Sequence, residues 1–310
     1  MSFDRTALIE ACRTHGIVAR VVVARLRGSG PREVGASMLV WQGGTSGTIG
    51  GGTLEHQATQ AARARTEIGS YHLSHHALGP DLGQCCGGAV DLVTEVFDLD
   101  HAQALPTDIV LRGPGARPLA VTRISAQARN AGTLPAPQLI DGWMVEPVTN
   151  PTRHIRIWGA GHVGRALVAV LAPLPATQIT WIDTGQDRFP DAIPPQVDVL
   201  VGTTPADLVR YAPHRSDHLI VTYSHALDLE LCHRLLTHGF DTAGLIGSAT
   251  KWARFRSRLA QLGHSDASIA QITCPIGRPA LGKHPQAIAL GVGAELLLRQ
   301  PRQRELENTA

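Results

Sequence analysis

Short runs of apolar residues alternate with helical spacing through the second half of this chain. Residues 155–158 form one such run and residues 179–182 form another, and both have the length of a buried β-strand. Between them, Val163, Leu167 and Leu171 recur at the spacing of one helix face. The pattern predicts a strand, a helix and a second strand, which is the repeating unit of a parallel α/β sheet.

The turn between the first predicted strand and its helix carries Gly159, Gly161 and Gly164, and Asp183 closes the second strand. In this GxGxxG spacing the first glycine allows a tight turn, the second lets the backbone approach a pyrophosphate, and the third allows the helix to pack on the strand. The helix start offers free N–H groups to a phosphate. We therefore predict a Rossmann-like domain in which Asp183 lies where a ribose hydroxyl is expected.

The same alternation continues to the end of the chain and extends the predicted parallel sheet. It predicts strands at 197–201, 219–222 and 242–246, helices at 227–236, 251–262 and 285–298, and a helical segment at 207–211.

The first half of the chain has a different order of elements. Asp4 can cap a first helix that ends at Gly16, and a second helix is expected over 53–67. Strands are expected at 17–26, 36–41, 71–78 and 89–97, followed by short strands at 109–112, 119–124 and 143–146. We therefore predict an α/β protein with an N-terminal mixed α/β domain over 1–147, a linker at 147–151, and a Rossmann-like domain over 152–310.

Composition narrows the class of protein. The 310 residues carry a formal net charge of only +2, and aromatic residues make up 4%, which argues against nucleic acid as a partner. No apolar run approaches the roughly 18 residues of a membrane helix, and the N-terminus lacks the pattern of a signal peptide. The cysteines form neither a CxxC pair nor a disulfide framework. We expect a cytoplasmic protein with reduced thiols and no membrane contact.

Two glycine-rich stretches in the first half are candidates for binding an anion. One is Gly28-Ser29-Gly30, flanked by Arg27 and Arg32, and the other is Gly50-Gly51-Gly52, followed by Glu55 at the start of a predicted helix. Consecutive glycines cost conformational entropy, which is reasonable where the backbone must closely approach a ligand. The alternative is a tight connection between strand and helix that binds nothing.

The segment Cys85-Cys86-Gly87-Gly88 is the most unusual in the chain. Its loop character can expose a thiol near backbone amides that favour the thiolate. The alternative is a pair of small buried residues beside a turn. Before this segment, the strand at 71–78 carries His72, His75 and His76, for which we favour solvated or core histidines over a metal site.

Taken together, these motifs resemble the xanthine dehydrogenase accessory family, the XdhC/CoxI-like proteins. The matching residues are Gly28 to Arg32, Gly35, Met38, Gly50 to Gly52, Glu55, Cys86 to Gly88, Gly159 to Gly164, Asp183, Gly244 to Ser248, Lys251, Pro275 to Gly277, Ala294 and Glu295. The resemblance covers most of the chain.

The resemblance implies a chaperone, not an enzyme, that binds the molybdenum cofactor (molybdopterin). It would hold the cofactor while a cysteine desulfurase partner supplies sulfur, and deliver it to the molybdenum-binding subunit of xanthine dehydrogenase. Cys86 is the expected metal ligand, because a soft thiolate suits molybdenum, and a homo-oligomer is expected. The alternative function is an NAD(P)-dependent oxidoreductase, which the GxGxxG turn and Asp183 favour.

Overall fold

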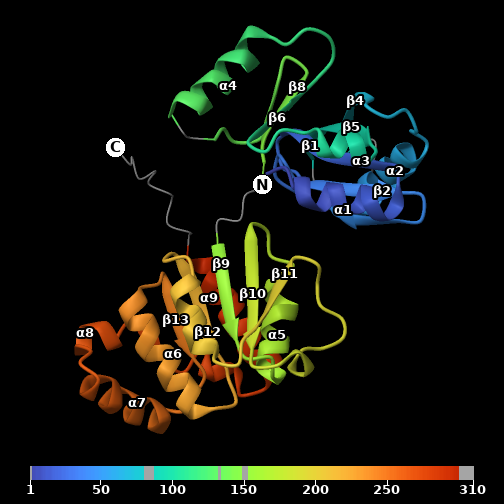
Figure 1. The fold of residues 1–310 in the computed structure, drawn as a ribbon. Helices are drawn as coiled ribbons and strands as arrows, with labels where there is room; N and C mark the ends of the chain where they lie inside the picture. The colour runs from blue at the N-terminus through green and yellow to red at the C-terminus, as the bar shows by residue number, and fades with distance from the viewer. Residues whose placement is uncertain (1, 80–86, 132–133, 149–152, 300–310) are drawn as a thin grey trace. The chain divides into compact units, whose positions relative to one another are not determined.

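The computed structural model describes residues 2–79, 87–131, 134–148 and 153–299. The chain divides into two compact units, Met1–Thr149 and Asn150–Glu307 (Figure 1). Each unit is described by itself below.

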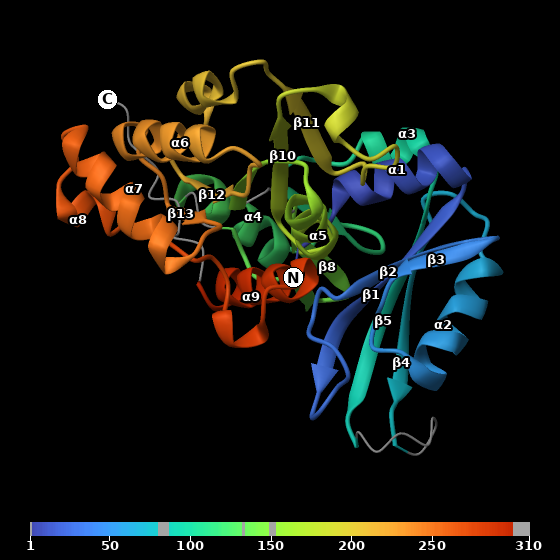
Figure 2. The same ribbon diagram turned by 90° about the horizontal axis from the view of Figure 1, so that it is seen from below.

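The first unit contains a five-stranded antiparallel sheet in the order β3-β2-β1-β5-β4. Its strands are β1 (Val18–Arg27), β2 (Ser37–Trp41), β3 (Gly44–Gly47), β4 (Tyr71–Ala77) and β5 (Ala89–Phe97). Helix α2 (Gly52–Arg63) covers one face through Leu54, Ala58 and Ala62, which pack on apolar side chains of β1, β2 and β5 (Figure 2). Helices α1 (Arg5–His15) and α3 (Leu99–Gln103) enclose a smaller core with the sheet.

A second layer of the first unit is a three-stranded antiparallel sheet in the order β6-β8-β7. Its strands are β6 (Ile109–Arg112), β7 (Gln138–Ile140) and β8 (Trp143–Pro147). The strand predicted at 119–124 is wrong, because these residues belong to helix α4 (Leu119–Ala131). Val121 and Ala128 lie on one face of α4 and pack on apolar residues of β6 and β8. The segment is helical because this apolar face covers the small sheet (Figure 1).

A buried cluster of charged side chains joins the two sheets of the first unit. Glu146 of β8 accepts a bidentate pair of hydrogen bonds from Arg20 of β1, at 2.7 and 3.0 Å, and another from Arg112 of β6. Arg112 also donates to Glu95 of β5, and the ring of Phe3 lies against both guanidinium groups. Burying charges is costly unless they are paired, and here each carboxylate has an arginine partner.

The second unit is a six-stranded parallel sheet in the order β11-β10-β9-β12-β13-β14. Its strands are β9 (Arg153–Trp158), β10 (Thr177–Asp183), β11 (Val197–Val201), β12 (Ser216–Ile220), β13 (Thr242–Leu245) and β14 (Ile272–Thr273). The order reverses between β9 and β12, the position where open α/β sheets bind ligands. The predicted Rossmann-like fold is confirmed.

Helices cover both faces of this parallel sheet. Helices α5 (His162–Leu171) and α9 (Pro285–Leu298) pack on one face around Ile155, Ile157 and Trp181. Helices α6 (His225–His238), α7 (Ala249–Gln261) and α8 (Asp266–Ile269) pack on the other, around Trp158 and Ile182. Three short 3₁₀ segments also occur among the described residues, at Gln186–Arg188, Pro205–Tyr211 and Pro279–Leu281. Within the described part of the chain, none of the helices has the length and apolarity needed to cross a bilayer.

Candidate functional site

The pairing of β1 with β5 brings two distant glycine segments of the first unit together. A Cβ atom at Gly88 would lie 2.2 Å from the carbonyl oxygen of Ser29 and 2.6 Å from that of Arg27. A Cβ at Gly50 would lie 2.4 Å from the side chain of Pro31. The segment 28–32 therefore contacts both the Gly50 loop and the start of β5, and the contacts are too close for larger residues.

Gly51 and Gly87 differ from these packed glycines. No atom lies within 4 Å of the position that a Cβ would take at either residue. Gly51 also has a φ of 75°, which glycine adopts without strain. Packing therefore explains Gly50 and Gly88, and a φ of 74° explains Gly28, whereas Gly51 and Gly87 leave accessible space beside the backbone. Gly52 has a φ of 66° and begins α2.

The carboxylate of Glu55 occupies the helix start that we expected to face an external anion. Its Oε2 accepts hydrogen bonds from the amides of Ile49, at 2.9 Å, and Gly51, at 3.0 Å, and from the hydroxyl of Thr48. The amide of Gly50 donates to Thr48 Oγ1 at 3.0 Å. Burial opposes ionisation, but these hydrogen bonds outweigh it and lower the pKa of Glu55. The expectation that these amides are available to a ligand is thereby corrected, because an acid from the first turn of α2 folds back onto them.

The two arginines that flank the first glycine segment have different surroundings. Arg32 Nε lies 3.3 Å from Glu33 Oε2, and its Nη1 donates to the carbonyl of Thr48 at 3.5 Å. Arg27 is exposed at the end of β1. Arg32 is thus tied to its own loop, while Arg27 is the better placed of the two to meet a ligand.

Cys85 and Cys86 lie outside the described residues. Gly87 is exposed and Gly88, whose carbonyl accepts from the amide of Leu78 at 2.9 Å, closes the end of the β4–β5 pair. Among the described residues, no group of three or more histidine, cysteine, aspartate or glutamate side chains is arranged to hold a metal ion. The metal-ligand role of Cys86 stays a prediction.

The Rossmann turn of the second unit has the glycine roles that its spacing predicts. A Cβ at Gly159 would lie 2.6 Å from the carbonyl oxygen of Val221, and one at Gly164 would lie 2.0 Å from that of Gly159. At Gly161, which caps α5 and is exposed, a Cβ would meet nothing within 4 Å. The turn therefore packs tightly on both sides and leaves its middle glycine accessible at the helix start.

Asp183 contacts this turn instead of facing solvent. It is 5% exposed, and its Oδ2 accepts from the amide of Ala160 at 2.6 Å while Oδ1 accepts from that of Thr184 at 2.6 Å. Arg188 lies 3.6 Å from Oδ1 and also lies against the exposed ring of Tyr223, at 4.3 Å from the ring centroid. The ribose contact that we expected of Asp183 stays a prediction, and in this structure adjacent parallel strands bring the carboxylate onto the turn amide.

A second buried carboxylate at the same edge of the sheet was not predicted from the sequence. Asp228 of α6 accepts from Thr222 Oγ1 at 2.7 Å and from Lys251 Nζ at 2.6 Å, and Lys251 also donates to the carbonyl of Ile246. Asp228 is fully buried, so Lys251 joins the ends of β12 and β13 to α6 and α7. The sequence did contain a signal for this buried acid, because Asp228 lies at helical spacing from Leu231 and Leu235 and therefore on the apolar face of α6.

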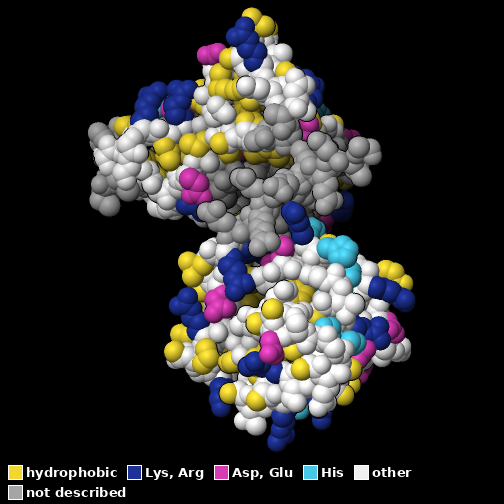
Figure 3. All heavy atoms as spheres, turned by 90° about the vertical axis from the view of Figure 1, so that its left-hand side faces the viewer, with side chains coloured by type: hydrophobic (Ala, Val, Ile, Leu, Met, Phe, Trp, Pro, Cys, Tyr) yellow, Lys and Arg dark blue, Asp and Glu magenta, His cyan; other side chains and the backbone are white. Residues whose placement is uncertain are grey.

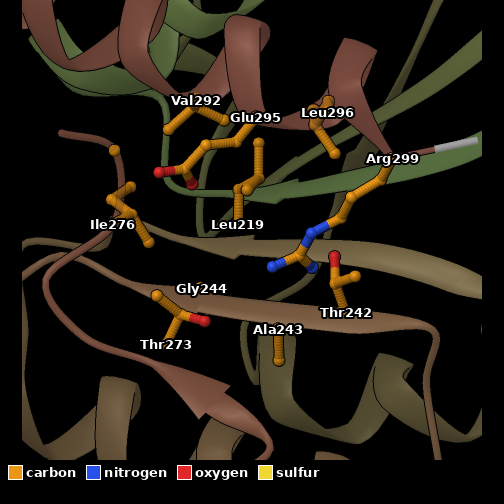
Figure 4. A pocket seen from close by; sticks show the side chains of 11 residues that line it. Leu219, Thr242, Ala243, Gly244, Thr273, Ile276, Val292, Glu295, Leu296 and Arg299 are labelled. Atoms are coloured by element: carbon orange, nitrogen blue, oxygen red, sulfur yellow. The ribbon is translucent and has the colours of Figure 1, made fainter.

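A cavity of the second unit lies between α9 and strands β12 to β14 (Figure 4). Gly244, Ile276 and Glu295 are among the residues that line it, and its volume is about 30 Å³. This is room for roughly one water molecule. A Cβ at Gly244 would lie 2.4 Å from Ile276, so this motif glycine serves packing.

On the face in Figure 3, basic and acidic side chains are interspersed.

The fold and these loops define a two-unit α/β protein with a glycine-lined site in a mixed α/β unit and a Rossmann unit. Residues 11–74 match the XdhC and CoxI family, and residues 155–296 match the XdhC Rossmann domain. The chain belongs to the XdhC and CoxI family, and the resemblance stated above is confirmed. Membership of this family supports a maturation-related role.

Individual relatives are distant. The chain is 24% identical over 300 residues to the uncharacterized protein YqeB of Escherichia coli (strain K12), covering 95% of this chain and 45% of YqeB. The chain thus spans less than half of that relative's length. A crystal structure described as a xanthine dehydrogenase from Bacillus halodurans superposes with a TM-score of 0.69 at 19% identity, covering 98% of each chain. At that identity the likeness shows a shared fold.

Proposed function

We propose that this chain is a maturation factor that binds the molybdenum cofactor and delivers it to the molybdenum-binding subunit of xanthine dehydrogenase. A cysteine desulfurase is the proposed partner that supplies sulfur while the cofactor is held. In this proposal the chain is a chaperone and not an enzyme, and it acts as a homo-oligomer. Family membership supports the maturation-related part of this proposal.

The observation that carries the ligand assignment is the convergence of distant segments on the loop at 28–32. The side chain of Pro31 packs on Gly50 and the carbonyl of Ser29 packs on Gly88, while Gly51 and Gly87 leave open space beside the loop. Exposed Arg27 supplies a cation at the same end of β1. These features suit a bulky ligand that carries a phosphate, because arginine is a common phosphate partner.

Cys86 directly precedes this described part of the site, next to Gly87. The bound cofactor would supply molybdenum, and the thiolate of Cys86 is a soft ligand that suits this metal. The residues Cys85, Cys86, Gly87, Gly88, Arg27, Arg32, Gly50, Gly51, Gly52 and Glu55 form the proposed cofactor-binding set of the first unit. The contacts above assign Glu55 and Arg32 to holding the loop that presents the set.

The test is the content of the purified full chain. Protein isolated from a molybdenum-competent host is expected to carry molybdenum and pterin in near-equal amounts, and to activate an apo xanthine dehydrogenase when mixed with it. Protein from a host that cannot make the cofactor is the control and should not activate. Stoichiometric nicotinamide with no pterin would contradict the proposal.

An NAD(P)-dependent oxidoreductase is the second candidate function. The observation in its favour is the accessible Gly161 at the start of α5, within the set Gly159, Gly161, Gly164 and Asp183. The engagement of both Asp183 oxygens with backbone amides weighs against a ribose contact. Calorimetric titration with NADH and NADPH tests it: micromolar binding would support a nucleotide site, and no binding would remove it.

A further inference from the structure

Strands β4, β5 and β1 are neighbours in the five-stranded sheet, and α2 lies against one face of it (Figure 2). On the opposite face the paired residues of these strands form rows. Side chains alternate between faces along a strand, and a register shift between Val23 and Arg25 of β1 lets both Val22 and Arg25 pair with residues of the same face of β5. One row is Leu73, Val93 and Val22, the next is His75, Asp91 and Arg25, and the last before the strands end is Ala77, Ala89 and Arg27. The rows therefore change from apolar to charged toward the glycine loops.

The middle of the charged row is a hydrogen-bonded pair. His75 Nδ1 lies 2.6 Å from Asp91 Oδ1, the side chain of Asp91 is 10% exposed, and that of His75 is 52% exposed. A carboxylate on one ring nitrogen orients the imidazole and leaves the other nitrogen to meet a partner. Nε2 of His75 is therefore the atom that this pair presents for binding.

Arginine side chains accompany this pair on β1. Arg25 Nη1 lies 3.7 Å from Asp91 Oδ2, and its Nη2 donates to the carbonyl of Leu139 in β7 at 3.3 Å. Arg27 follows one row further and is exposed. Beside it, Ala77 and Ala89 are only half-buried, so the small side chains form an accessible floor.

We infer that His75, held by Asp91, forms with Arg25 and Arg27 a binding subsite for a phosphate group. The inference deepens the proposed function and rests on it for the identity of the natural ligand, a phosphate monoester. The arginines and a protonated His75 outnumber the single carboxylate of Asp91, which favours an anion. Arginine beside the imidazole also disfavours a bound cation, because like charges repel.

The subsite binds its anion more strongly at low pH. With Nδ1 on Asp91, the ring of His75 donates from Nε2 only in its protonated form, in which both nitrogens carry a hydrogen. Among the described residues, Asp91 of β5 pairs with His75, Arg25 of β1 lies on the other oxygen of Asp91, Arg27 lies one row further along β1, and β4 is an edge strand. Affinity is expected to be higher for the protonated ring and therefore to fall as pH rises.

Sulfate is the probe for the pH arm, because it does not titrate in this range, and inorganic phosphate is the second probe. The full chain, with labelled histidine, is titrated at pH 6 and pH 8 while the His75 resonance is followed. His75→Gln and Arg27→Ala are each expected to weaken sulfate binding about fivefold at pH 6, in line with one lost charge-assisted hydrogen bond at a half-exposed site. His75→Gln should also abolish the difference between the two pH values.

The matched controls lie on the other face of the sheet or beyond it. His72 is exposed and alternates with His75 along β4, and Arg65 lowers the pKa of His72 after the larger effect of burial. His72→Gln and Arg65→Ala should bind sulfate as the wild type does. Equal weakening in the controls, or binding unchanged in both His75→Gln and Arg27→Ala, would overturn the inference.

Molybdenum and pterin content is measured on the same variants to separate this inference from the proposed function. Wild-type protein that carries pterin but shows no His75 response to sulfate would leave the proposed function in place and overturn the subsite. A His75 response in protein that never carries pterin would support an anion site while contradicting the proposed function.

Discussion

The main-chain amide of Ala160 donates a hydrogen bond of 2.6 Å to Oδ2 of Asp183, which joins the turn after β9 to the end of β10. Trp181 Nε1 donates to the carbonyl of Gly159 at 3.0 Å, two residues earlier on β10. Two side chains of β10 therefore hydrogen-bond to the turn: Asp183 accepts from it and Trp181 donates to it. In this unit the acid that follows the GxGxxG turn stabilises the turn itself.

Gly161 and Gly164 should respond differently to substitution. Gly161→Val is expected to fold normally, because no atom occupies the Cβ position, and to abolish binding of any nucleotide or phosphate at the turn. Gly164→Ala should lower the free energy of unfolding by about 3 kcal/mol, since its Cβ would meet the Gly159 carbonyl. Chemical denaturation and ligand titration measure the two effects. Equal ligand binding in wild type and Gly161→Val would show that the turn is not a ligand site.

Cys86→Ser should remove most molybdenum and pterin from the purified chain while leaving thermal stability nearly unchanged. A serine hydroxyl is a harder and mostly protonated ligand than a thiolate. Cys85→Ser is the matched control and should have a smaller effect. Metal analysis and pterin fluorescence provide the readout. Full molybdenum retention in Cys86→Ser would remove this residue as the ligand, and a joint loss of cofactor and stability would favour a packing role.

Arg27→Ala should reduce cofactor retention more than Arg32→Ala. Arg32 is bonded to Glu33 and to the Thr48 carbonyl, whereas Arg27 is exposed at the end of its strand. An electrostatic contact weakens as salt rises, so retention by the wild type should fall with salt and retention by Arg27→Ala should depend on salt less. Retention measured by gel filtration across a salt series tests this. Identical, salt-independent retention in both variants would exclude a phosphate contact for either arginine.

Glu146→Gln should destabilise the first unit more than Glu95→Gln. Burial opposes ionisation of both carboxylates, yet Arg20 and Arg112 outweigh it at Glu146 and lower its pKa, whereas at Glu95 burial prevails and raises the pKa. Glu146 bonds both arginines, so its loss leaves buried Arg20 with only a 3.8 Å contact to Glu95, at a cost of about 3–5 kcal/mol. Urea denaturation of both variants at pH 7 compares them. A larger cost for Glu95→Gln would contradict this order.

His218 should make the second unit sensitive to acid. It is fully buried, accepts from Trp158 Nε1 at 3.1 Å, and its pKa is lowered to about 3, first by burial and then by Arg156 and His238. In the unfolded chain His218 is protonated below about pH 6.5, whereas in the folded chain it is protonated only below about pH 3. The free energy of unfolding therefore falls as pH drops between these two values. Each pH unit in this window should cost up to about 1.4 kcal/mol.

His218→Gln tests this effect, since glutamine keeps an acceptor for the Trp158 indole but does not titrate. Exchange of the Trp158 Nε1 proton with solvent, followed from pH 7 to 5, should accelerate less steeply with acid in the variant than in the wild type. The exposed His284→Gln is the control and should follow the wild type. Parallel profiles for wild type and His218→Gln would show that His218 does not carry the acid response.

The Rossmann unit could be predicted because its information is local. The spacing of Gly159, Gly161 and Gly164 after an apolar strand leaves few backbone solutions, and the first and third glycines pack as that spacing requires. Apolar runs likewise predicted β11, β12 and β13, whereas the two-residue strand β14 was not predicted from the sequence. The same local signals located the glycine loop at 28–32 and the Gly50 loop.

Tertiary structure decided which partner each polar group meets. The segment 119–124 is helical because Val121 and Ala128 cover a small sheet whose strands come from later residues. Folding brings the carboxylates of Glu55 and Asp183 within hydrogen-bonding distance of loop amides. It likewise brings the carboxylate of Asp91 to the imidazole of His75. The sequence shows which side chains can form hydrogen bonds, but not with which partners. A buried charge without a partner costs much free energy of desolvation, so the tertiary packing determines the partner that each buried charge has.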